Sequence, residues 1–205
     1  MDLYRRQFIK RGGLWVTGAV VLPQAVRASA AMPWLKHSRG PSGGSGGGGG
    51  GGGTAFVTGQ TLGTARTDGG NYYTGIRITI GAANVTVSEL GRYTTAGSSG
   101  THPIYFAALD GTPVVAGSIN AAGGANAMLF VSVTPTVLTA GQDYWLLCQE
   151  VTGGDTFYDD NTTITTTAVA TVTHSAYVAT YGGAPMTNGA AGHSYGPVSF
   201  KYTSP

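Results

Sequence analysis

The chain has 205 residues, only 10% of them charged, and a formal net charge of +2 at neutral pH. The basic excess lies before residue 54 and mostly in residues 1–30, because from Thr54 onward four basic residues stand against eight acidic ones. Nucleic acids and anionic membranes are therefore excluded as expected partners. The single cysteine, Cys148, excludes a disulfide within the chain.

Residues 1–30 contain the three parts of an export signal in order. Arg5 and Arg6 precede an aromatic and apolar pair, an apolar run covers residues 14–26, and small residues end at Ala30. The run is too short to span a membrane, so we expect cleavage after Ala30 and no stable membrane insertion afterwards. The arginine pair resembles a twin-arginine signal. That resemblance implies export from a bacterial or archaeal cell to the periplasm, the cell surface or the extracellular space.

Residues 31–53 end in a Gly- and Ser-rich stretch whose last eight residues are all glycine. Such a segment has no side chains to bury and the largest backbone entropy to lose on folding. We therefore predict a disordered segment and flexible Gly-rich tether over residues 31–53, followed by one folded domain over residues 54–205.

The composition of residues 54–205 is typical of β-strands. Ile76, Ile78 and Ile80 alternate with polar residues, and an apolar–polar alternation also covers residues 129–133. The segment "DYWLLCQE", residues 143–150, is apolar on both faces and is predicted to be a central strand. Within it, Cys148 is expected to be a small buried hydrophobic residue.

Glycine-containing turn signals separate these runs roughly every dozen residues. Asp110-Gly111 lies between two β-like runs and predicts a hairpin with a type I′ turn. Gly153-Gly154 predicts a loop after the central strand. Together the runs predict an all-β fold, a single antiparallel β-sandwich or jelly-roll domain of about nine strands.

The segment "GGDTFYDDN", residues 153–161, concentrates acidic residues in a chain with few charges. Carboxylate and amide oxygens are the ligands that Ca²⁺ prefers, which makes Glu150, Asp155, Asp159 and Asn161 a candidate calcium set. The match to a calcium loop is partial, because Ile164 occupies the position of the required glycine. A solvated acidic turn is the alternative, and a pair of glycosidase carboxylates is a third.

The same segment is also a candidate ligand-binding edge. Exposed aromatic rings stack on sugars while carboxylates accept hydrogen bonds from sugar hydroxyls. The candidate residues are Phe157, Tyr158, Asp155, Asp159 and Asp160. Four more tyrosines lie near predicted strand ends, namely Tyr72, Tyr73, Tyr177 and Tyr181. Alternatively, these tyrosines are ordinary half-buried strand residues.

A copper or zinc site through histidine is not expected. His102, His174 and His193 show no short ligand spacing with one another or with Cys148. No cofactor is predicted, and Ca²⁺ is the only candidate ion.

Three stretches resemble a known family: Leu90-Gly91-Arg92-Tyr93, residues 149–160, and the closing "GPVSFKY". Over residues 54–202 the chain is similar to the secreted bacterial modules of the domain of unknown function 4082 family. The resemblance implies a β-sandwich module found alone or beside carbohydrate-active and immunoglobulin-like domains, and hence a binding or adhesive role.

The sequence therefore predicts an exported, non-catalytic module that binds carbohydrate or another cell-surface ligand. A structural or adhesive surface subunit that self-associates through its sheet edges is the alternative. A polysaccharide-acting enzyme is the third hypothesis.

Overall fold

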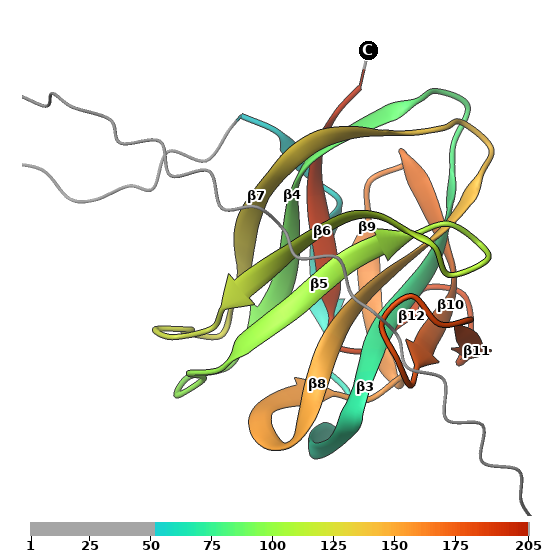
Figure 1. Cartoon of the computed structure of the whole chain (residues 1–205). Helices are drawn as coiled ribbons and strands as arrows, with labels where there is room; N and C mark the ends of the chain where they lie inside the picture. Colours follow the sequence, from blue (N-terminus) through green and yellow to red (C-terminus); the bar gives the residue numbers. More distant parts are fainter. Residues whose placement is uncertain (1–51, 205) are drawn as a thin grey trace, which may run out of the picture. The chain divides into compact units, whose positions relative to one another are not determined.

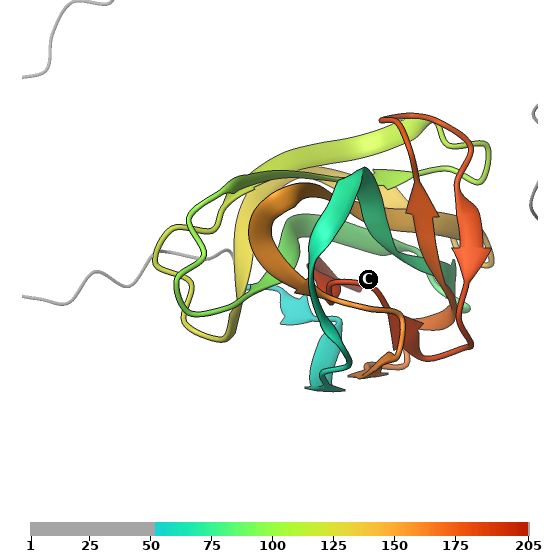
Figure 2. The ribbon, with the colours of Figure 1, turned by 90° about the horizontal axis from the view of Figure 1, so that it is seen from below.

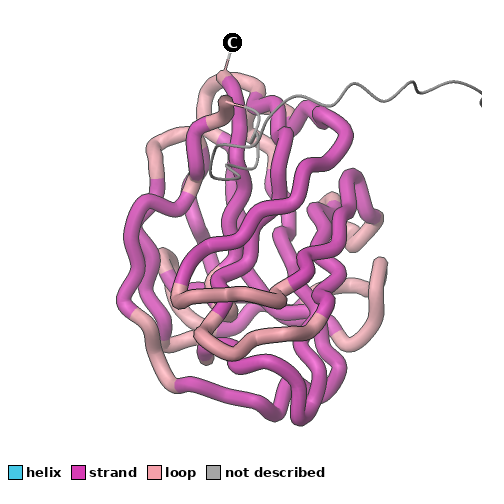
Figure 3. The backbone as a smooth tube through the Cα atoms, turned by 90° about the vertical axis from the view of Figure 1, so that its left-hand side faces the viewer, coloured by secondary structure: helices cyan, strands magenta, loops and turns pink. Residues whose placement is uncertain are grey.

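A computed structural model of the chain describes residues 52–204. The predicted signal, with Arg5, Arg6 and cleavage after Ala30, lies outside the described residues. So does the predicted tether, except for Gly52 and Gly53. Every described element is a β-strand or a loop, as Figure 3 shows, and none is a helix that could cross a membrane.

Thirteen antiparallel strands form three sheets in the described residues. The four-stranded sheet has the order β1 (Thr54–Ala55), β13 (Val198–Thr203), β4 (Val85–Thr94) and β7 (Ala127–Leu138). The six-stranded sheet has the order β11 (Met186–Asn188), β10 (Ala170–Val178), β3 (Ala65–Ile80), β8 (Asp143–Tyr158), β5 (Thr101–Ala107) and β6 (Pro113–Asn120). A small sheet has the order β12 (His193–Ser194), β9 (Thr162–Thr166) and β2 (Val57–Thr61).

The main core lies between the two larger sheets, which form the front and back layers in Figure 1. Ile76, Ile78 and Ile80 on β3 point into it, as their alternation predicts, and meet residues of the opposite sheet such as Phe200. Burying large apolar side chains of this kind contributes about 1.5–3 kcal/mol each. The period-2 pattern therefore identified the face that holds the sheets together.

The central position of β8 is confirmed, because it pairs with β3 on one side and β5 on the other. Leu146 and Cys148 face the main core, whereas Trp145 and Leu147 join a second apolar cluster on the outer face of the six-stranded sheet. Cys148 is fully buried, as predicted. A strand with both faces buried lacks alternation, which explains its continuous apolar sequence.

The predicted count of nine strands is too low. Five of the thirteen strands contain only two to five residues: β1, β2, β9, β11 and β12. Runs this short do not show a readable apolar alternation, and β9 is threonine-rich with a single isoleucine, Ile164. They form because neighbouring strands offer unpaired backbone groups, which is a property of the folded sheet rather than of the local sequence.

The hairpin at Asp110-Gly111 is confirmed, but its turn is not type I′. β5 and β6 are joined by residues 108–112, with positive φ at Gly111 alone. The Asp110 carboxylate accepts a hydrogen bond from the Thr112 amide, and the Ala108 amide bonds to the Thr112 carbonyl. The carboxylate therefore stabilises a longer turn in which only Gly111 needs the left-handed conformation.

The predicted loop at Gly153-Gly154 is in fact part of β8, which continues to Tyr158. Figure 2 shows this end of β8 bending together with the beginning of β3. The register of the β3–β8 pairing shifts between Arg66 and Tyr72. The backbone φ angle is positive at Gly70, Asn71 and Gly153. Glycine is needed here because it permits the sharp bend without breaking the ladder.

Candidate functional site

The bent end of β3 and β8 lies beside two clusters of charged side chains. The two strands approach so closely that a Cβ atom at Gly69 would lie 2.6 Å from the Cβ and the carbonyl oxygen of Glu150. This contact requires glycine. The bend places one charge cluster inside the domain and another at its surface, with a pocket beside the second.

The inner cluster joins the two large sheets through Arg92 on β4 and Glu150 on β8. The Arg92 Nε and Nη2 atoms donate to the two Glu150 carboxylate oxygens at 2.8 and 2.7 Å, and Nη1 donates to the Tyr93 carbonyl. Their side chains are 0% and 1% exposed. Burial lowers the pKa of Arg92, but its bonds to Glu150 outweigh that effect and raise it, so the guanidinium stays charged.

His102 extends the inner cluster to Asp155. Its Nδ1 lies 2.9 Å from the Gln149 carbonyl oxygen and its Nε2 lies 3.0 Å from Asp155 Oδ2. His102 therefore connects the Gln149 backbone to Asp155 beside the Arg92–Glu150 pair. The inner cluster is defined by these residues: Arg92, Glu150, His102 and Asp155.

Asp155 also fixes the loop between β4 and β5. Its carboxylate accepts hydrogen bonds from the Ser99 and Gly100 amides, the latter at 2.7 Å. Burial raises the pKa of Asp155, but the bonds from His102 and the two amides outweigh this and hold that pKa below its ordinary value. Asp155 is therefore a structural carboxylate, with both of its oxygens hydrogen-bonded within the protein.

The four predicted calcium ligands have separate protein partners. Glu150 binds Arg92, Asp155 binds His102, Asp159 accepts from Arg66 Nη1 at 2.8 Å, and the Asn161 amide bonds Thr64. Because each group is engaged elsewhere, the structure does not bring them together around one ion.

One different cluster has ligand atoms within 4.8 Å of one another in the described chain: His102, Cys148 and Glu150. Both His102 nitrogens and both Glu150 oxygens already have partners. Burial raises the pKa of the Cys148 thiol well above its ordinary value, which disfavours the thiolate a metal needs. This cluster therefore fits a structural role better than a metal centre.

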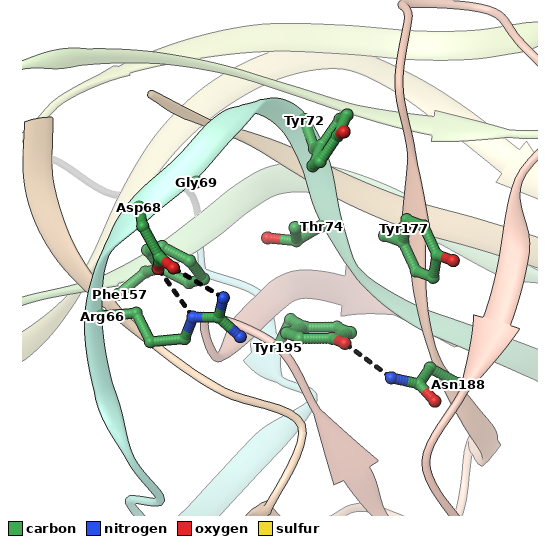
Figure 4. Close-up of a pocket in the computed structure, with 9 residues that line it drawn as sticks. All are labelled: Arg66, Asp68, Gly69, Tyr72, Thr74, Phe157, Tyr177, Asn188 and Tyr195. Atoms are coloured by element: carbon green, nitrogen blue, oxygen red, sulfur yellow. Dashed lines mark hydrogen bonds and ion pairs between the residues drawn. The ribbon is translucent and has the colours of Figure 1, made fainter. Parts of the chain in front are cut away.

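A pocket of about 240 Å³ opens beside the bend, shown in Figure 4. Its aromatic lining consists of Tyr72, Tyr177, Tyr195 and Phe157. The ring centroids of Tyr72 and Tyr177 are 6.4 Å apart, and those of Tyr177 and Tyr195 are 6.5 Å apart. Tyr195 is held by a 2.7 Å hydrogen bond from the Asn188 amide to its hydroxyl. Pockets for drug-sized ligands have volumes of about 300–1,000 Å³, so this smaller pocket suits only a small ligand.

Arg66 and Asp68 form the polar side of the pocket. With Asp159, which lies behind the lining, they make up the outer cluster. Arg66 donates from Nε and Nη2 to both Asp68 oxygens and from Nη1 to Asp159. The Asp68 side chain is 63% exposed. Its carboxylate oxygens each keep a lone pair for a further donor, so the cluster presents acceptors to the pocket.

Thr74 contributes an unsatisfied hydroxyl to the same pocket. The residue is 5% exposed, and its Oγ1 has no hydrogen-bond partner within the described protein. In Figure 4 this hydroxyl points into the space bounded by Tyr72 and Tyr195. A buried polar group without a partner costs about 1–3 kcal/mol. A bound molecule that supplies a partner would remove that cost.

The structure separates the predicted ring residues. Tyr72 and Tyr177 line the pocket, whereas Tyr73 and Tyr181 pack with Tyr105 on the outer face of the six-stranded sheet. Phe157 lines the pocket but is only 2% exposed, so it supports the other rings.

The remaining predicted binding residues lie off the pocket lining. Tyr158 is half-buried and packs on Tyr93, with ring centroids 6.0 Å apart. Asp160 is half-buried and its backbone carbonyl bonds His193. Of the five predicted binding residues, only Phe157 lines the pocket at the bend.

Sequence reasoning did not identify Arg66, Asp68, Thr74 or Tyr195 as site residues. The spacing of Arg66 and Asp68 was a usable signal, because residues two apart in a strand share one face. Nothing local marks Thr74 or Tyr195, since their roles depend on strands that meet only in the fold.

The chain matches no protein-family model, no curated protein and no solved structure.

Proposed function

We propose that the domain is a non-catalytic β-sandwich module that binds carbohydrate in the pocket formed by Tyr72, Tyr177 and Tyr195. The observation that carries this proposal is the combination of three tyrosine rings with the buried, unpartnered hydroxyl of Thr74. Rings stack on the apolar face of a sugar, while a hydroxyl and carboxylates hydrogen-bond its hydroxyl groups.

The size and openness of the site support a saccharide. A pocket of about 240 Å³ suits one sugar ring, and Tyr72, at 45% exposed, offers its ring at the entrance. An extended chain could continue into solvent from the bound ring. A cell-surface glycan has this form, in accordance with the proposed export to the periplasm, the cell surface or the extracellular space.

Glycoside hydrolysis is a weaker hypothesis for this pocket. That reaction needs a carboxylic acid of raised pKa beside a second carboxylate. Here the hydrogen bonds from Arg66 hold the pKa of Asp68 below its ordinary value. Glu150, whose pKa burial raises, is sealed inside the domain and paired with Arg92. The pocket therefore supplies acceptors and lacks an accessible proton donor of the required kind.

The test compares tyrosine variants of the mature protein for retention on a panel of soluble and insoluble polysaccharides. Tyr72→Ala and Tyr177→Ala should each lose retention. Tyr181→Ala is the matched control, because Tyr181 is 51% exposed, close to the value for Tyr72, but lies outside the pocket. Melting temperatures verify that the variants are folded.

Two results would count against the proposal. One is that no glycan retains the wild-type protein. The other is that Tyr181→Ala weakens retention as much as Tyr72→Ala does. Failure to bind any glycan together with concentration-dependent assembly in size-exclusion chromatography would favour the self-associating surface subunit.

A further inference from the structure

The charge around the pocket is unbalanced toward the negative. Asp68 and Asp159 share a single cation, Arg66. Asp160 adds a third carboxylate near Tyr195. Burial is the main reason that the pKa of the Tyr195 hydroxyl is raised, and the negative charges of Asp160 and Asp159 raise it further. Asp68 lines the pocket, and Asp159 and Asp160 lie behind its lining, so three acidic groups stand near one arginine.

The other cations of the described domain are paired elsewhere. Arg77 binds Asp143, Arg92 binds Glu150, and Lys201 binds Glu89. Arg66 is therefore the only arginine or lysine of the described domain that lies at the pocket.

The tyrosine rings add a second attraction for positive charge. Tyr72 and Tyr177 are inclined at 54°, and Tyr177 and Tyr195 at 79°, so no two of these neighbours stack face to face. Figure 4 shows the three rings around one space. A cation within about 6 Å of a ring centroid gains about 0.5–1 kcal/mol at an exposed site and more when it is desolvated.

An acidic sugar fits this site poorly. Arg66 already donates three hydrogen bonds to carboxylates. A ligand carboxylate would have to displace Asp68 or Asp159 or sit beside them, and like charges in contact repel. The Thr74 hydroxyl, in contrast, can accept a hydrogen bond from an ammonium group or donate one to a neutral hydroxyl.

We propose that the pocket prefers a sugar that carries a free, protonated amino group over a neutral or acidic sugar. The inference rests on the proposed function, since it names the chemical class of the bound saccharide. The ammonium group would lie among the tyrosine rings within reach of Asp68, and the Thr74 hydroxyl would contact the same ring.

The test uses three hexasaccharides as probes of a single size: chitosan hexamer with free amines, chitin hexamer with acetylated amines, and galacturonate hexamer with carboxylates. Calorimetric titration at pH 6 and low salt should show chitosan hexamer binding about tenfold more tightly than chitin hexamer. Galacturonate hexamer should not bind. At 1 M salt the preference should shrink, because charge attraction is screened.

Variants separate the charge preference from binding itself. Asp68→Asn should remove most of the preference, so that chitosan and chitin hexamers bind with similar affinity, whereas Tyr72→Ala should weaken both and keep the ratio of their affinities. Asp110→Asn is the control, because Asp110 is an exposed acid on the β5–β6 turn. It should change neither affinity.

Equal affinity for chitosan and chitin, both lost in Tyr72→Ala, would overturn this inference and leave the proposed function standing. Loss of chitosan binding in Asp110→Asn to the same extent as in Asp68→Asn would also overturn it, since the attraction would then be general. No binding of any of the three hexamers and no retention on the polysaccharide panel would overturn both proposals.

Discussion

Two arginine–carboxylate clusters lie beside the bend of β3 and β8, and they differ chiefly in burial. In the inner cluster, Arg92 holds Glu150 at 2.7 Å and the two side chains are 0% and 1% exposed. In the outer cluster, Arg66 holds Asp68 at the same distance, but the side chains are 37% and 63% exposed. The chemistry of the ion pair is the same, so its surroundings decide what the pair contributes.

Because the inner cluster is buried, the stability of the fold depends on each of its charges keeping a partner. Charges removed from water are tolerated only when each has a close partner, and loss of one partner leaves the other uncompensated. At the surface, water replaces a lost partner, and an exposed ion pair contributes about 0–1 kcal/mol. The inner cluster therefore fixes β4 against β8, while the outer cluster is free to exchange partners with a ligand.

The largest expected effect is the loss of Arg92. Arg92→Met retains an apolar stem but leaves the Glu150 carboxylate buried without its cation. We expect the free energy of unfolding to fall by about 3–5 kcal/mol at pH 7, measured by urea denaturation. Arg66→Met is the matched control and should cost less than about 1 kcal/mol.

A double variant keeps this prediction testable if Arg92→Met does not fold. Arg92→Met with Glu150→Leu removes both charges of the pair and should recover much of the lost stability. Equal losses in Arg92→Met and Arg66→Met would contradict the distinction between the clusters.

The next effect is a pH dependence from Asp155. The folded-state pKa of Asp155 is below its ordinary value, so its contribution is present above the unfolded pKa of about 4. That contribution is lost as the pH falls through the folded-state pKa. Asp155→Asn should therefore be about 1–3 kcal/mol less stable than wild type at pH 7. The difference should vanish near pH 2, as measured by urea denaturation across pH.

Asp68→Asn is the comparison for this pH effect. The pKa of Asp68 is also lowered, by its bond to Arg66, but the group is solvated and its contribution is screened. Its variant should show a smaller acid-dependent difference than Asp155→Asn. A difference between wild type and Asp155→Asn that stays constant from pH 7 to pH 2 would refute the ionised role of Asp155.

The same contrast explains which parts of the fold the sequence reveals. The spacing of Ile76, Ile78 and Ile80 predicts a buried strand face, because every second side chain of a strand points to the same side of the sheet. The sequence Gly153-Gly154 does not show whether the strand ends or bends there, since a glycine with positive φ, such as Gly153, occurs both in turns and in β-bulges. Continued pairing of β8 with β3, a long-range contact, determines that the chain bends there rather than ends its strand.

Less of the candidate site than of the fold could be predicted from the sequence. Tyr72 and Tyr177 could be named as ring candidates from their positions near strand ends, but not as neighbours. Arg92 and Glu150 are 58 residues apart, and their pairing depends on how the two sheets face each other. Glu150 nevertheless lies close behind the apolar run of β8, and a charge that is buried beside such a run needs a partner of opposite sign.

The smallest expected effect is the salt response of the outer cluster. Exposed charges are largely screened when the Debye length falls from about 10 Å at 0.1 M salt to about 3 Å at 1 M. The stability difference between wild type and Arg66→Met should therefore be below about 1 kcal/mol at low salt and near zero at 1 M salt. The Arg92→Met difference should persist at 1 M, because ions do not reach a pair that is 0% and 1% exposed. Urea denaturation at the two salt concentrations measures both. A difference for Arg92→Met that disappears at 1 M salt would mean that solvent reaches the inner cluster and that burial does not separate the two clusters.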